Sequence, residues 1–196
     1  MSLQNYEAFD NDELLNLALD ASRKEDFQKS LELLKAVIGQ DDKNAKAHYL
    51  LGAVHAQLSL YDKAVDDLAR ALDIDPNLDS ARFQLGLLFI SSHRLDDAIQ
   101  VWEKLDRLGD DNPLVLFKTG LVHLANDEYD QCIRLLEQGI EKNNILESLN
   151  NDMRKIMASA QSALDGTSSN TSDDATGVQR HVFLSSYENQ DDKKND

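Results

Sequence analysis

Cysteine and long apolar runs are scarce in this chain of 196 residues. A single cysteine, Cys132, excludes an internal disulfide and favours a reducing compartment. No apolar run is long enough to span a bilayer, and the N-terminus lacks the basic and then apolar pattern of a secretory signal. These absences predict a cytoplasmic protein that does not insert into a membrane.

Positive charge is also in short supply. The chain has 20 Lys and Arg against 36 Asp and Glu, which gives a formal net charge of −16. Nucleic acids and anionic membranes need a cationic surface that replaces their counterions, so both are disfavoured as partners. Basic or apolar partners are favoured instead. Only two prolines occur and alternating β-type patterns are nearly absent, so the chain should be helical.

What the chain does contain is a pattern that returns every 34 residues. Four consecutive units align without a gap: 11–44, 45–78, 79–112 and 113–146. Positions 8 and 20 of each unit are small, and position 24 is large. Position 8 is Ala18, Gly52, Gly86 and Gly120, position 20 is Ser30, Ala64, Ala98 and Cys132, and position 24 is Leu34, Leu68, Trp102 and Leu136.

This pattern predicts an antiparallel pair of helices in each unit, which we call helix A and helix B. Small residues at positions 8 and 20 let the two helices approach closely. Large residues at positions 7, 17 and 24 fill the wedge towards the next pair. Since one pair cannot bury its own apolar stripe, the pairs must stack. Asn11 or Asp12 is expected to cap the first helix.

These residues resemble the tetratricopeptide repeat, whose pattern includes Leu at position 7, Gly at 8, Ala at 20 and 27, and Pro at 32. Unit 45–78 fits it best, with Leu51, Gly52, Ala64, Ala71 and Pro76. The other units depart from it, for example at Ala18, Thr119 and Gly139. The resemblance implies an all-α fold in which four helix hairpins form a right-handed superhelix.

The segments outside the four units have different compositions. Residues 1–10 are polar and expected to be flexible. Residues 147–165 predict a C-terminal capping helix, because apolar residues recur there every three or four positions and the other side is polar. Residues 166–196 are rich in Ser, Thr, Asn and Asp, which predicts a disordered acidic and polar tail. One apolar island, from Val182 to Tyr187, interrupts this tail.

No group of residues predicts catalysis, a cofactor or a metal site. His55 and His123 both occupy position 11, where the family prefers an aromatic residue, so each is interpreted as a substitute for a packed ring. Cys132 is interpreted as an inert packing thiol. Adjacent pairs such as Asp66 and Asp67 lack the alternating spacing of a calcium loop. The chain is therefore predicted not to be an enzyme.

The most informative surface is the second face of helix A, formed by positions 2, 5, 9 and 12, which in this family lines a concave groove. In the third and fourth units helix A is apolar on both faces, and such a helix needs a cover on both sides. The cover is either a partner seated in the groove or curvature of the superhelix that already shades these residues. The predicted groove residues are Tyr49, Phe83, Leu87, Ile90, Phe117, Lys118, Leu121 and Leu124.

This groove predicts a non-catalytic adaptor or chaperone-like scaffold that holds an apolar peptide or helix of a partner protein. The size and layout are similar to those of bacterial secretion chaperones that carry apolar translocators. A clamp for a chaperone's C-terminal carboxylate is excluded, because Leu15, Leu19 and Leu50 replace its polar residues. The alternative is a self-associating structural protein, in which the groove forms a homodimer or is plugged by the Val182–Tyr187 island.

Overall fold

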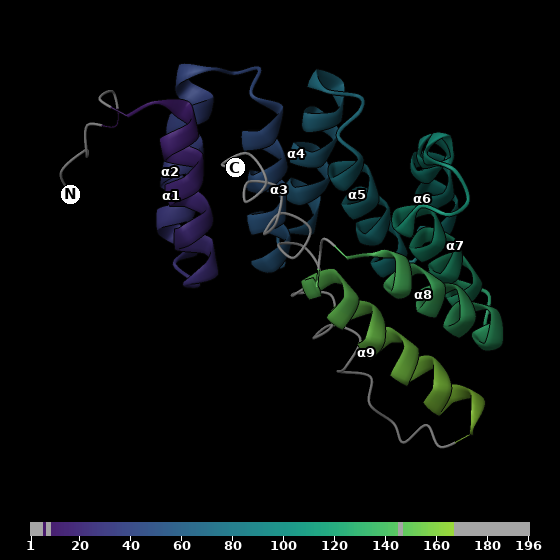
Figure 1. The fold of residues 1–196 in the computed structure, drawn as a ribbon. Coiled ribbons are helices and arrows are strands. Elements are labelled where there is room, and N and C mark those ends of the chain that lie inside the picture. Colours follow the sequence, from purple (N-terminus) through teal and green to yellow (C-terminus); the bar gives the residue numbers. More distant parts are fainter. Residues whose placement is uncertain (1–5, 7–8, 145–146, 167–196) are drawn as a thin grey trace. The chain divides into compact units, whose positions relative to one another are not determined.

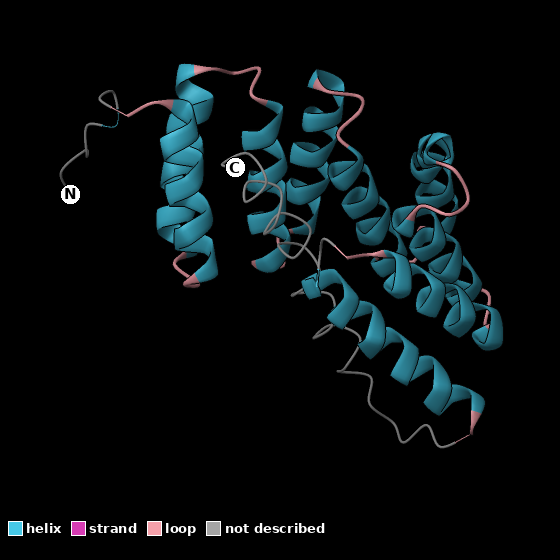
Figure 2. Cartoon of the chain, viewed as in Figure 1, coloured by secondary structure: helices cyan, strands magenta, loops and turns pink. Residues whose placement is uncertain are grey.

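The computed structural model describes residue 6 and residues 9–144 and 147–166. These residues form α-helices, 3₁₀ helices and the turns between them, and contain no strand (Figures 1 and 2). The all-α prediction is therefore confirmed. Two compact parts can be distinguished, Met1–Ala81 and Arg82–Asp196, which are described in turn. None of the described helices is both long enough and apolar enough to cross a membrane. The handedness of the superhelix stays a prediction.

The N-terminal part contains two helix pairs. These are α1 (Asn11–Arg23) with α2 (Phe27–Gln40), and α3 (Ala45–Gln57) with α4 (Tyr61–Ile74). Each pair packs along its own apolar stripe, and α2 also packs against α3. Leu14, Leu34 and Leu68, from three of these helices, are fully buried. Helix-period spacing of apolar residues therefore produces the stacked pairs that the repeat pattern predicts.

The C-terminal part begins within α5 (Asp79–Ser91), which spans the boundary between the two parts. It continues with α6 (Leu95–Trp102), the 3₁₀ helix η2 (Glu103–Leu108), α7 (Pro113–Ala125), α8 (Tyr129–Lys142) and α9 (Glu147–Leu164). Helix α7 packs on α8, and α8 packs on α9. The predicted capping helix thus lies against α8, and its role in closing the stack stays a prediction.

Short polar side chains fix the starts of the A helices. Asp10 caps α1, because its carboxylate accepts the Glu13 N–H at 2.7 Å while the Glu13 carboxylate accepts the Asp10 N–H at 3.2 Å. The predicted caps, Asn11 and Asp12, were wrong by one and two residues, since both lie inside the helix. Asn44 caps α3 with a single bond, because its Oδ1 accepts the Ala47 N–H at 3.0 Å. Asp10 and Asn44 are 34 residues apart and occupy the same position of the pattern. The repeat register could therefore have predicted Asp10 as the cap of α1.

The small residue at position 8 brings helices A and B together, as predicted. A Cβ atom on Gly52 would lie 2.9 Å from Cγ of Leu68 and 3.2 Å from the carbonyl oxygen of Ala64. A Cβ atom on Gly86 would overlap the indole of Trp102. The residue at position 24 thus packs on the glycine of its own helix pair, whereas the repeat pattern predicted a place in the wedge towards the next pair.

The turn from helix A to helix B has one backbone geometry in all four units. Position 15 has a positive φ of 58–60°, although none of the four residues is glycine: Glu25, Ser59, His93 and Asp127. The N–H of the following residue donates to the carbonyl oxygen five residues earlier, as from Leu60 to His55 at 2.8 Å. The turn is therefore defined by its hydrogen bonds, and the residues adopt a conformation that usually favours glycine.

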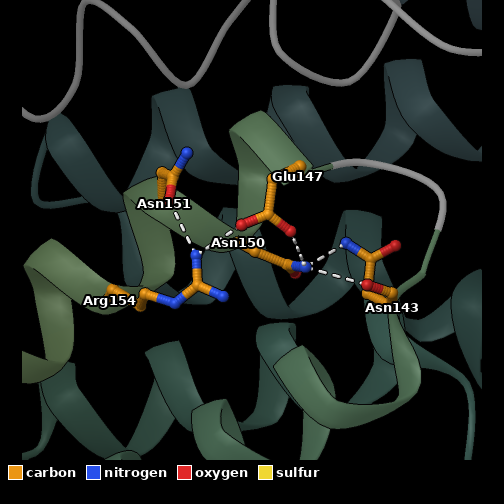
Figure 3. A network of polar contacts seen from close by, with 5 residues as sticks. All are labelled: Asn143, Glu147, Asn150, Asn151 and Arg154. Atoms are coloured by element: carbon orange, nitrogen blue, oxygen red, sulfur yellow. Dashed lines mark hydrogen bonds and ion pairs between the residues drawn. The ribbon is translucent and has the colours of Figure 1, made fainter.

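A polar network joins α9 to the end of α8 (Figure 3). The Asn143 side chain donates to Oδ1 of Asn150 at 2.8 Å, and Nδ2 of Asn150 donates back to the Asn143 carbonyl oxygen at 2.8 Å. Glu147 accepts from Asn150 at 3.2 Å and from Arg154 at 2.7 Å. Asn143 and Asn150 are buried, whereas Glu147 and Arg154 are exposed. Polar contacts therefore set the position of α9, while its apolar side supplies the burial.

Candidate binding site

Two phenylalanine rings form the floor of the predicted groove. Phe83 on α5 and Phe117 on α7 both occupy position 5, both are fully buried, and their ring centroids lie 6.5 Å apart. Phe83 also stacks on Trp102 with a centroid distance of 5.8 Å. These ring contacts link α5 to α6 and α7. Phe83 and Phe117 are therefore already covered by the fold itself, without a partner in the groove.

Further along the same face of α5 and α7, the side chains become accessible. Leu87 and Leu121 at position 9 are 9% and 2% exposed, whereas Ile90 and Leu124 at position 12 are half-buried. Positions 5, 9 and 12 follow one helix face at spacings of four and three residues. Exposure therefore rises from the phenylalanine floor towards the ends of both helices. We call Leu87, Ile90, Leu121 and Leu124 the apolar strip.

Lys118, predicted at one edge of the groove, is held in an ion pair. Its Nζ lies 2.6 Å from the Asp106 carboxylate in η2, and its side chain is 14% exposed. Solvent screens a pair with one well-covered partner less than a fully exposed pair. The Lys118 charge is therefore largely balanced by Asp106, and we do not expect it to attract an acidic partner.

Tyr49, predicted at the other edge, lies in the N-terminal part and is 1% exposed. Ala53 and Ala56, which follow it on the same helix face, are fully buried. The groove face of the second unit therefore presents almost no side chain to solvent. A binding role for Tyr49 stays a prediction.

One accessible apolar residue was not predicted from the sequence. Leu17 occupies position 7, which was assigned to the core, but it is 44% exposed and lies beside Phe9, which is 43% exposed. The equivalent Leu51 and Leu85 are only 7% and 5% exposed. The register contained one signal, because Leu17 belongs to the first of the four units, 11–44.

The two histidines at position 11 also contact carboxylates, which the sequence did not indicate. The His55 side chain is only 12% exposed, which agrees with a packed ring. Nδ1 of His55 lies 2.6 Å from Oδ2 of Asp67, which joins α3 to α4. His123 on α7 contacts the carboxylate of Glu128, just before α8. Burial raises the pKa of Asp67 above its ordinary value, and the His55 hydrogen bond partly offsets this rise.

Cys132 is buried, and burial raises the pKa of its thiol to about 11. A protonated, covered thiol is a poor nucleophile, in keeping with a packing role. Within the ranges that the structure describes, no three His, Cys, Asp or Glu side chains gather where a metal ion could bind. The Val182–Tyr187 island, and with it the predicted plug, lies outside the described residues.

Comparison with known proteins identifies the repeat. Residues 15–79 match the family model of the tetratricopeptide repeat. No curated protein matches the sequence. The fold is similar to that of MamA (41-end) from Desulfovibrio magneticus RS-1, with 14% identity and a TM-score of 0.59 over 94% of this chain and 96% of that chain.

Two further solved structures share the fold. A tetratricopeptide repeat protein from Parabacteroides merdae ATCC 43184 is 18% identical, with a TM-score of 0.60 over 92% of this chain and 74% of that chain. YrrB, described as a tetratricopeptide repeat protein with an unusual peptide-binding site, is 15% identical, with a TM-score of 0.55 over 91% of this chain and 88% of that chain.

Proposed function

Because this chain is a tetratricopeptide repeat protein, we propose that it is a non-catalytic scaffold that binds an apolar peptide or helix of a partner protein. The contact lies on the apolar strip of α5 and α7. A cytoplasmic location and a chaperone-like role belong to the same proposal. A peptide is a reasonable class of ligand, since YrrB, which has a similar fold, is described as having a peptide-binding site.

The observation that carries this proposal is the change in exposure along α5 and α7. The Phe83 ring packs against both Phe117 and Trp102, so the base of the strip is rigid. Ile90 lies at the accessible end of this face of α5, and Leu124 lies at the accessible end of the same face of α7. A rigid, preformed apolar surface loses little entropy when a partner covers it, which favours binding.

The chemistry of the strip indicates the kind of partner. It presents two half-buried aliphatic side chains, Ile90 and Leu124, above the buried Leu87 and Leu121. Lys118 on α7 is already paired with Asp106. With a chain charge of −16, a segment that is apolar on its contact side and neutral or basic elsewhere would bind best. Covering Ile90 and Leu124 contributes about 1.5–3 kcal/mol each at most. Because a micromolar affinity requires about 8 kcal/mol in addition to association costs, the partner is expected to contact further surface around the strip.

Affinity purification of the full chain from native lysate, read by mass spectrometry, tests the proposal. The double variant Ile90→Glu/Leu124→Glu places two charges on the strip and should lose the co-purifying partner. Ile99→Glu/Leu164→Glu is the matched control, because those residues are 40% and 44% exposed and lie outside the strip. Both variants must keep the helical circular dichroism of the wild type. Equal partner recovery from both would exclude the strip.

A further inference from the structure

The outer face of the first helix pair is an exposed stacking surface. Leu17 is 44% exposed, although the same position is 7% exposed in the second unit and 5% exposed in the third. Ala21 and Leu33 lie on the same side of α1 and α2. In a stacked array, residues at these positions pack against another helix. Leu17 therefore presents to solvent a position that the next two units bury.

This surface is hollowed. A cavity of about 420 Å³ lies over it, with Tyr6, Phe9, Leu17 and Leu33 among its lining residues. Tyr6 is held in place, because its hydroxyl accepts from Nζ of Lys29 at 2.6 Å and its carbonyl oxygen accepts from the Gln40 side chain at 3.2 Å. The hollow thus has an aromatic wall that is fixed by hydrogen bonds, and an apolar base in which Leu17 is exposed and Leu33 is buried.

The charges around the hollow are balanced, unlike those of the chain as a whole. Its lining includes two acidic and two basic side chains, Asp20, Lys24, Asp26 and Lys29, whereas the net charge of the chain is −16. A surface that meets its own copy across a two-fold axis cannot carry a large charge of one sign, because it would repel itself. Mixed charges avoid this and let a lysine of one copy face an aspartate of the other.

The other exposed end helix has a different character. Helix α9 packs on α8 with its apolar side, while Glu147, Asn151 and Arg154 lie on its exposed side. That polar surface is a poor counterpart for the Leu17 hollow, so head-to-tail stacking into filaments is disfavoured. We propose that the hollow is the contact of a closed, two-fold homodimer, in which the Leu17 faces of two copies cover each other.

Sedimentation equilibrium of the full chain, from about 1 to 100 µM, tests this contact. We expect a species of twice the chain mass of 22.0 kDa. Leu17→Glu should weaken the dimer more than about 100-fold, because the dimer carries the substitution twice and one buried leucine accounts for about tenfold. Ile99→Glu is the matched control, since Ile99 is 40% exposed and lies in α6, and it should leave the dimer unchanged.

A charge exchange gives a second, independent readout. Lys24→Asp makes the rim acidic and Asp20→Lys makes it basic, so each variant alone should be a monomer. Their equimolar mixture should recover the dimer. The lost contact within one chain is the exposed Lys24–Asp20 pair at 2.7 Å, whose removal changes folding little.

Three results would each overturn the inference. The first is a monomeric full chain at 100 µM. The second is a dimer that Leu17→Glu leaves intact, including one that forms through the apolar strip instead. The third is a mixture of the two charge variants that stays monomeric while the wild type dimerises.

Discussion

The indole of Trp102 lies directly over Gly86 and occupies the space that any Cβ atom there would need. The same indole donates its N–H to the Phe83 carbonyl oxygen at 3.0 Å, in the same helix as the glycine. One tryptophan therefore fixes both the distance between α5 and α6 and the rotation of α5. Since α5 carries half of the apolar strip, the strip depends on this contact.

Gly86→Ala should reduce the free energy of unfolding by about 3 kcal/mol, because overpacked cores relax only by displacing side chains or backbone. Gly39→Ala is the control. Gly39 lies on the exposed side of α2, and no packing neighbour lies within 4 Å of the place that an alanine Cβ would take, so alanine should stabilise the chain by up to about 1 kcal/mol. Urea unfolding followed by circular dichroism measures both. A neutral Gly86→Ala would mean that Trp102 moves freely.

Glycine at position 15 should stabilise the turns between helices A and B. The left-handed conformation costs a non-glycine residue about 1–2 kcal/mol, while glycine loses about 0.5–1 kcal/mol more chain entropy on folding. Ser59→Gly and His93→Gly should therefore each raise the free energy of unfolding by about 0.5–1 kcal/mol. Thermal unfolding measures the gain. Ser59→Ala keeps the unfavourable φ of 59° and should show none.

Asp67 should make stability fall as the pH rises. Burial raises its folded-state pKa above the ordinary 3.8, so the folded chain holds this proton more tightly than the unfolded chain. The stabilisation is complete below the unfolded pKa and is lost as the pH rises through the folded pKa. The free energy of unfolding of the wild type minus that of Asp67→Asn should therefore decrease as the pH rises from below 3.8 through the raised folded-state pKa.

Asp111 provides a comparison of opposite sign. Its hydrogen bond with Lys142, at 2.7 Å, lowers the pKa of Asp111. The stabilisation is present above the unfolded pKa and is lost as the pH falls through the folded pKa. The difference between wild type and Asp111→Asn should thus increase with pH, and only slightly, because both groups are exposed. Parallel slopes for the two variants would contradict this assignment.

Asn150→Ala should loosen α9. The substitution leaves the buried Asn143 side chain without its acceptor and the Asn143 carbonyl oxygen without this donor, which costs about 2–3 kcal/mol. Hydrogen exchange of the α9 amides should become faster than that of the α8 amides. Asn151→Ala removes only an exposed bond to Arg154 and should change stability by less than about 0.5 kcal/mol. Equal exchange in the two variants would show that apolar packing alone holds α9.

The helix pairs could be predicted from the sequence because their cause is local. Small residues at positions 8 and 20 recur with the 34-residue spacing, and contacts such as Gly52 with Leu68 are separated by half a unit. Helix starts follow the same register, as Asp10 and Asn44 show. Such short-range constraints are repeated four times, so an irregular residue in one unit does not obscure them.

The candidate site was harder to predict, because burial of a second helix face depends on contacts between units. Helical periodicity shows that α5 and α7 are apolar on two sides, but not that Phe83 and Phe117 meet each other 34 residues apart. It also cannot show that Lys118 finds Asp106. Leu17 illustrates the reverse error, since a position assigned to the core is 44% exposed in the first unit.

The polar outer side of α9 bears on how an array of this kind could lengthen during evolution. A helix pair added after Gly166 would meet Glu147, Asn151 and Arg154, which offer it no apolar face. A pair duplicated within residues 45–142 would instead find matching glycines and leucines on both sides. Longer homologues should therefore differ from this chain by internal duplications of about 34 residues, with the α9 sequence kept at the end of the array.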